Sequence, residues 1–208
     1  MKTGHSHPRN VRRNSPIILL VLLMATGVFI PNYAGGTDWA AEVVNYSPVM
    51  RNGTPEAPYR DPSRALGVPD WDGHDICTSC TFVSLGYGGS ITLGFSVAFS
   101  GGGSTDGDIL VYEVGPSSEN TVVEVSADAV TWYVVGTATG DWYSAVNIDD
   151  NGFGPDAQLW YVRLTDVAGQ GQQSGPNLGA DIDGVGVVTT HPVSAEPSNW
   201  GAIKSIYR

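Results

Sequence analysis

Short runs of alternating apolar and polar residues, separated by turn-forming residues, recur along most of this 208-residue sequence. In the run SITLGFSV, residues 90–97, the alternation places Ile91, Leu93, Phe95 and Val97 on one side of an extended chain. Helical periodicity is almost absent after the first 30 residues. A period of two predicts strands that bury one face, and the 27 glycines suit the turns and bulges between them.

Nine segments carry this strand-like pattern, with turn signals between them, and we therefore expect an all-β fold. The predicted architecture is an antiparallel β-sandwich or jelly roll of about nine short strands. Trp132 and Trp160 are assigned to its core. The predicted strands cover residues 41–46, 81–85, 90–97, 108–114, 121–127, 132–136, 144–148, 158–165 and 182–189.

The first 34 residues have the three-part layout of a secretory signal. A basic start precedes the apolar run Ile17–Ile30, and small residues follow at Ala34 and Gly35. An uncleaved anchor is the alternative, but the run is shorter than the roughly 20 residues that a spanning helix needs. We expect a signal peptide over residues 1–34, a sandwich domain over 35–192 and a tail over 193–208. The protein is then secreted or associated with the cell surface, without membrane insertion after cleavage.

The charge of the remaining chain restricts its partners. Cleavage after residue 34 removes four of the ten basic residues and none of the 21 acidic ones, which leaves a net charge of −15. Such a surface repels nucleic acid and anionic lipid, so we exclude both as partners. It attracts divalent cations.

The two cysteines, Cys77 and Cys80, lie in the sequence DICTSC. Outside the cell, this spacing is most simply a tight local disulfide. A zinc site would need about four ligands, and a thioredoxin-type redox motif would need a helix start in a βαβ unit. Only His74 is close enough in the sequence to add a zinc ligand.

Acidic residues cluster where strands are expected to begin. Asp106 and Asp108 precede one apolar run, which ends at Glu113, and Asp181 and Asp183 open another. An Asp-x-Asp spacing presents two carboxylates on one side of an extended chain, and Ca²⁺ prefers such oxygen ligands. Because strand ends gather at two poles of a sandwich, both pairs could meet at one pole. The alternative is that these residues cap turns. Alternation places Glu113 on the face opposite Asp108, which makes it the hardest of the five to assign.

Three aromatic residues lie outside the alternating apolar faces, namely Trp71, Trp142 and Tyr143. Exposed rings beside acids and amides are typical of sites where sugar rings stack. Alternatively, the three rings close the ends of the sandwich. The sequence contains no GxSxG, HExxH or Walker motif, and lone loop histidines are poor candidates for a general base. We therefore expect a protein that is not an enzyme and assign no catalytic residue.

Several blocks, in this order, resemble a module of bacterial secreted and cell-surface proteins. They include DPSRALGVPD, VSLGYGGSITLGF, GDILVYE, VEVSADAVTW, YVRLTD and GADIDGV, and they extend from about Val43 to Val188. The resemblance implies a jelly roll akin to discoidin and galactose-binding domains, and a non-catalytic binding or adhesion role, often with one structural calcium. The chain departs from the family at Ala129, where SADG is usual. Alanine in a left-handed turn would cost about 1 kcal/mol, so we expect a differently shaped turn.

Three functions follow as hypotheses. The first is a calcium-stabilised module that binds carbohydrate or a surface protein. The second is a structural subunit that assembles into a surface layer or filament through its tail, NWGAIKSIYR, or its N-terminal strand. The third is a polysaccharide hydrolase, which would need two facing carboxylates, one of them in an apolar setting that raises its pKa.

Overall fold

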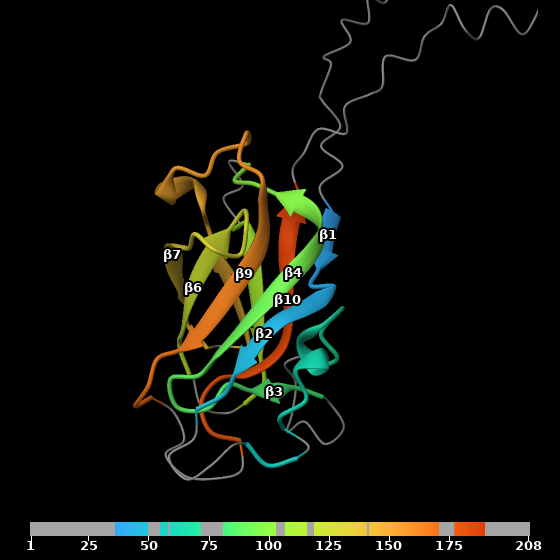
Figure 1. The fold of residues 1–208 in the computed structure, drawn as a ribbon, viewed down its shortest axis with the longest axis vertical. Helices are drawn as coiled ribbons and strands as arrows, with labels where there is room; N and C mark the ends of the chain where they lie inside the picture. Colours follow the sequence, from blue (N-terminus) through green and yellow to red (C-terminus); the bar gives the residue numbers. More distant parts are fainter. Residues whose placement is uncertain are drawn as a thin grey trace, which may run out of the picture. The chain divides into compact units, whose positions relative to one another are not determined.

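The computed structural model describes residues 36–49, 55–57, 59–71, 81–102, 107–115, 119–140, 142–170 and 177–189. These residues form an all-β sandwich of two open antiparallel sheets (Figure 1). In the first sheet, the strand order is β1 (Gly36–Trp39), β10 (Asp181–Thr189), β5 (Ile109–Glu113) and β8 (Tyr143–Val146), and β3 (Val83–Ser84) also pairs with β10. In the second sheet, the order is β2 (Glu42–Ser47), β4 (Ser90–Phe99), β9 (Leu159–Asp166), β6 (Thr121–Ser126) and β7 (Tyr133–Ala138).

All nine predicted strands are present, and the structure adds one that the sequence pattern does not reveal. That strand is β1, whose four residues, GTDW, contain no apolar alternation. It pairs with the end of β10, where Trp39 lies opposite Gly186. Two short 3₁₀ helices, η1 (Pro62–Ala65) and η2 (Asp149–Asn151), lie in the connections. Among the described residues, no helix is long and apolar enough to cross a membrane.

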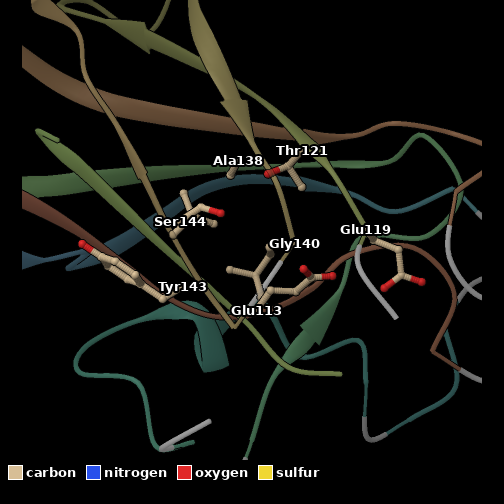
Figure 2. Close-up of a pocket in the computed structure, with 9 residues that line it drawn as sticks. Glu113, Glu119, Thr121, Ala138, Gly140, Tyr143 and Ser144 are labelled. Carbon is tan, nitrogen blue, oxygen red and sulfur yellow. The ribbon is translucent and has the colours of Figure 1, made fainter. Parts of the chain in front are cut away.

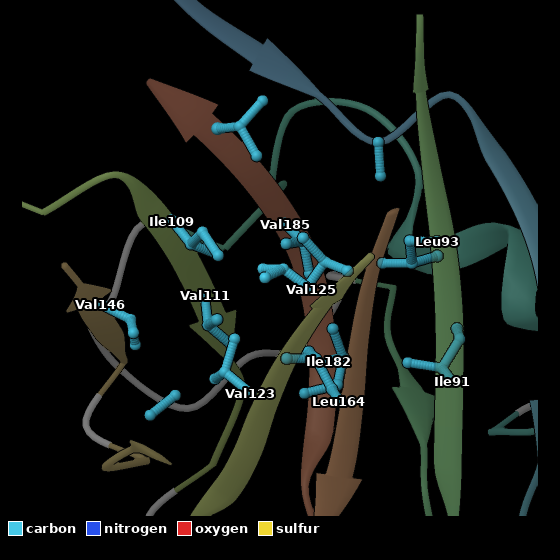
Figure 3. Close-up of a cluster of buried hydrophobic side chains, with 14 of the residues drawn as sticks. Ile91, Leu93, Ile109, Val111, Val123, Val125, Val146, Leu164, Ile182 and Val185 are labelled. Carbon is cyan, nitrogen blue, oxygen red and sulfur yellow. The ribbon is translucent and has the colours of Figure 1, made fainter. Parts of the chain in front are cut away.

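The core lies between the two sheets, as the alternation predicts. Ile91 and Leu93 of β4 enter it from one sheet, and Ile109 and Val111 of β5 enter it from the other (Figure 3). Burial of these branched side chains on facing strands supplies the main driving force for the sandwich. Leu110 and Tyr112 of β5 therefore point to the opposite side of their sheet.

Two aromatic residues assigned to the core by sequence lie elsewhere. The pairing of β9 with β4 is irregular between Tyr161 and Leu159, so Leu159 and Val162 both point inward and Trp160 turns outward. Trp160 is 37% exposed. Trp132 is half-buried and lies against the guanidinium of Arg163, whose central carbon is 4.3 Å from the ring centroid. Both core assignments are wrong, because the alternation of apolar and polar residues on which they were based does not continue through Trp132 or Trp160.

The turn at Ala129 does adopt the left-handed conformation that the sequence analysis expected it to avoid. Ala129 has a φ angle of 58°. Asp128 holds the turn, since one of its carboxylate oxygens accepts hydrogen bonds from the backbone N–H groups of Val130 and Thr131 at 2.9 and 2.8 Å. These bonds, that of Thr131 first, lower the pKa of Asp128. The hydrogen bonds offset the backbone cost of the alanine.

The predicted signal peptide and C-terminal tail lie outside the described residues, as do Cys77, Cys80 and Asp106. The disulfide prediction and the role of Asp106 therefore stay predictions.

Candidate functional site

The outer face of the first sheet carries a group of aromatic rings around two glycines. Register places Tyr112 opposite both Tyr143 of β8 and Gly184 of β10. Trp39 lies opposite Gly186, and a side chain added there would meet its ring at 3.1 Å. Gly186 therefore leaves room for the Trp39 ring to lie on the sheet.

Four of these rings form one continuous surface, which we call the aromatic platform. It consists of Trp39, Tyr112, Trp142 and Tyr143. Tyr112 is central, with centroid distances of 5.6 Å to Trp39, 5.2 Å to Tyr143 and 6.4 Å to Trp142. Trp142 and Tyr143 also contact each other at 6.1 Å. They are 44% and 36% exposed, so the platform faces solvent.

Trp142 holds an unusual backbone conformation within this platform. Its φ angle is 42°, in the left-handed region that bulky residues rarely adopt. Its carbonyl accepts a hydrogen bond from the backbone N–H of Glu113 at 3.1 Å, which ties it to the end of β5. A conformation of this kind costs on the order of 1–3 kcal/mol and is concentrated at functional sites.

The third predicted ligand-binding residue, Trp71, is not one of the four rings of the platform. Its backbone N–H donates to Asp183 at 3.0 Å, and Asp70 donates to the same carboxylate. The two bonds fasten the loop after η1 to the bulge in β10, where Asp183 and Gly184 break the register. Burial raises the pKa of Asp183 to about 6. The structure thus brings the predicted residues Trp142 and Tyr143 together in the platform. It also contains Trp39 and Tyr112, which the sequence pattern did not indicate as ligand-binding residues.

The predicted acidic residues lie at opposite ends of the first sheet. Asp108 precedes β5 and Glu113 ends it, so they are separated by about 17 Å at roughly 3.4 Å per residue. Asp181 lies at the Glu113 end, because Ile182 is opposite Glu113. Asp108 and Asp181 therefore do not meet at one pole as the sequence analysis expected. Within the described parts of the chain, no group of three or more His, Cys, Asp or Glu side chains is arranged to hold a metal ion.

The carboxylates of Asp181 and Asp183 do not lie together either, because the bulge in β10 lies between the two residues. Asp181 is 4% exposed and accepts hydrogen bonds from the Ser84 hydroxyl and from the Asn177 amide at 2.8 Å. Burial raises its pKa well above the usual range. Its role in the structure is to fix the turn before β10 to β3.

Asp108 is fully buried at the other pole. One carboxylate oxygen accepts a hydrogen bond from Ile148 at 2.9 Å, whereas Oδ1 has no partner among the described residues. Burial raises the pKa of Asp108, and the nearby Asp149 adds to the effect. The hydrogen bond from Ile148 is that of a turn-capping residue and connects β5 to the segment after β8.

Glu113 lies in a pocket between the two sheets, with Glu119 and Thr121 (Figure 2). It points to the core side, on the same face of β5 as Ile109 and Val111, and is 5% exposed. Neither of its carboxylate oxygens has a hydrogen-bond partner in the part of the chain that is described. Burial, followed by the proximity of Glu119, raises the pKa of Glu113 to about 10.

Sequence reasoning missed Glu119, although it is also 5% exposed. It follows the loop after β5 and showed no motif. Glu119 lies just before β6 and Glu113 ends β5. The pairing of β5 with β10 and of β6 with β9 places these two residues next to each other. No known protein-family model matches the sequence, and no curated protein matches it either.

Proposed function

We propose that this protein is a non-catalytic carbohydrate-binding module and that sugar rings stack on the aromatic platform. The observation that carries the proposal is the continuous exposed surface of Trp39, Tyr112, Trp142 and Tyr143 on a rigid sheet. Apolar faces of sugar rings pack against such rings, and the tyrosine hydroxyls can bond to sugar hydroxyls.

The size of the platform favours a short saccharide over a protein partner. The two most exposed rings, Trp142 and Tyr143, are 44% and 36% exposed. With roughly 200 Å² for each aromatic side chain, they offer on the order of 160 Å². A stable protein interface buries about 800 Å² on each partner, with aromatic residues at its centre. The platform alone is too small for that.

The buried Glu113–Glu119 pair is a poor candidate for the hydrolase alternative. A glycosidase needs two carboxylates on either side of a bound sugar. The pocket that Glu113 and Glu119 line has no room for a water molecule, and therefore none for a sugar ring. The platform, by contrast, is open to solvent.

The secretory signal predicted over residues 1–34 supports a place for this module outside the cell, where polysaccharides are accessible. The resemblance to cell-surface modules points the same way. The high negative charge suits a neutral or basic glycan better than an acidic one.

Affinity electrophoresis and sedimentation with defined polysaccharides test the proposal. The probes are cellulose, chitin, xylan and galactomannan. We expect at least one to bind, with Trp142→Ala and Tyr143→Ala each weakening binding about tenfold, which corresponds to roughly 1.4 kcal/mol. Trp160→Ala is the matched control, because Trp160 is exposed to a similar extent but lies in the other sheet.

The proposal is wrong if none of the four polysaccharides binds the wild-type chain. It is also wrong if Trp160→Ala weakens binding as much as the platform variants do. Thermal unfolding of each variant confirms that the comparison concerns folded protein.

A further inference from the structure

The connection from β7 to β8 leads into two of the four platform rings and lies against the buried side chain of Glu113. Trp142 ends this connection, and Tyr143 is the first residue of β8. Tyr143 lines the same pocket as Glu113 and Gly140. Figure 2 shows Gly140 beside the Glu113 side chain. The backbone of the connection therefore determines where the two most exposed rings of the platform lie.

Gly140 packs directly on the two acidic residues of the pocket. Its φ angle is 58°, and a side chain there would collide with the backbone of Glu119 and lie 2.7 Å from Oε2 of Glu113. Packing as close as this leaves no slack between the Glu113 carboxyl group and the backbone of Gly140. A displacement of that carboxyl group is therefore passed on to the connection.

The backbone of Trp142 needs support from its neighbours. Its φ angle of 42° is strained, and such a conformation persists only where the surrounding structure fixes it. The carbonyl of Trp142 accepts a hydrogen bond from the backbone N–H of Glu113 at 3.1 Å. The backbone N–H of Thr139 donates to the hydroxyl of Ser144 at 2.9 Å and closes the connection. Glu113 thus contacts the connection twice, through its backbone at Trp142 and through its side chain at Gly140.

The surroundings of the Glu113 carboxyl group favour the neutral acid. Both carboxyl oxygens are buried without a hydrogen-bond partner among the described residues, and the pocket has no room for a water molecule. The two carboxyl groups and the Thr121 hydroxyl are too few for the roughly six to eight oxygens that Ca²⁺ needs. An ionised carboxylate in this place is strongly destabilised, whereas the neutral acid can donate its proton to Glu119.

The titratable groups around Glu113 reinforce this preference. Glu119, which precedes β6, and Asp181 of β10 both disfavour ionisation of Glu113. Asp166 of β9 acts on Asp181 in the same way, and Tyr143 is the titratable residue that β8 contributes to the pocket. Within the described chain, no basic side chain is among the groups that act on Glu113. Burial, followed by these acids, raises the pKa of Glu113 to about 10.

We propose that the neutral side chain of Glu113 is a positioning residue for the aromatic platform. Paired with Glu119, it supports Gly140 and does not itself touch the sugar. Loss of the side chain, or its ionisation, then displaces the connection and moves Trp142, because the other walls of the pocket belong to paired strands. The consequence for sugar binding rests on the proposed function, whereas the position of the connection does not.

Fluorine NMR of protein labelled with 5-fluorotryptophan tests the position of Trp142 directly. The resonances of Trp142 and Trp160 are identified by their loss in Trp142→Phe and Trp160→Phe. We expect Glu113→Ala to shift the Trp142 resonance. Glu113→Gln should keep it, because glutamine has the shape of the neutral acid. The Trp160 resonance, from the other sheet, should stay in place in both variants.

A pH series separates the charge of Glu113 from its shape. Between pH 7 and pH 10, the Trp142 resonance of the wild type should shift, because Glu113 ionises as its pKa is approached. Glu113→Gln should show no such shift. Tyrosine ionisation is retained in that variant, so a shift caused by tyrosines would persist in it. Circular dichroism at each pH confirms that the protein is folded. This series does not require Glu113→Ala to fold.

Binding to the polysaccharides named above measures the functional consequence. We expect Glu113→Ala to weaken binding about tenfold and Glu113→Gln to retain it. Asp108→Ala is the matched control, because Asp108 is also a buried acid with an unpartnered oxygen among the described residues but precedes the opposite end of β5. It should keep both the Trp142 resonance and the binding.

The inference is overturned if the Trp142 resonance is the same in Glu113→Ala as in the wild type, or if the shift with pH persists in Glu113→Gln. It is also overturned if Asp108→Ala moves the Trp142 resonance as far as Glu113→Ala does. If the expected shifts are seen but no polysaccharide binds the wild type, the proposed function is wrong and the positioning role is supported. Binding without these shifts contradicts the positioning role alone.

Discussion

The stability of the metal-free protein should fall steeply with rising pH because of Glu113. Its pKa is raised from 4.5 to about 10 in the folded state, chiefly by burial. Between these values, the folded chain holds a proton that the unfolded chain has lost. The free energy of unfolding therefore decreases as pH rises, by about 1.4 kcal/mol per pH unit for this group. From pH 6 to pH 8, the expected loss is about 3 kcal/mol.

Urea unfolding in EDTA at pH 6, 7 and 8 measures this loss. Glu113→Gln should remove the share that Glu113 contributes and be more stable than the wild type at pH 8. The variant keeps every other titrating group, including Asp181, whose raised pKa acts in the same direction. The reasoning is refuted if wild type and Glu113→Gln show the same dependence on pH.

Three further substitutions have defined expectations. Gly140→Ala should destabilise the fold by about 2 kcal/mol or more in urea unfolding, since the new methyl group has no space beside Glu119 and the φ angle is positive. Asp183→Ala should cost about 1–3 kcal/mol and expose the segment around Asp70 to limited proteolysis, because two backbone N–H groups lose their acceptor. Unchanged protease resistance would contradict it. Ala129→Gly should raise stability by about 0.5–1 kcal/mol, seen as a higher melting temperature, because its φ angle of 58° suits glycine. A lower melting temperature would show that the turn is not strained.

Part of the candidate site could be predicted from sequence because it depends on local pattern. Trp142 and Tyr143 were chosen because they interrupt the apolar alternation, and they do lie exposed together. Trp39 was missed because β1 exists only through pairing with β10. Glu119 was missed because nothing near it in sequence indicates burial; it is buried by strands that are distant along the chain.

Alternation with a period of two, broken by turn residues, was sufficient to determine the fold class, nearly all the strands and the inward direction of residues such as Val123 and Val125. That follows because side-chain direction along a strand is a local property. Only the tertiary structure decided which acids meet, since strand order and register set those distances. Irregular pairing decided the rest. The register shift between β4 and β9 leaves Trp160 outward, and one extra residue in β10 directs Asp181 and Asp183 to different partners.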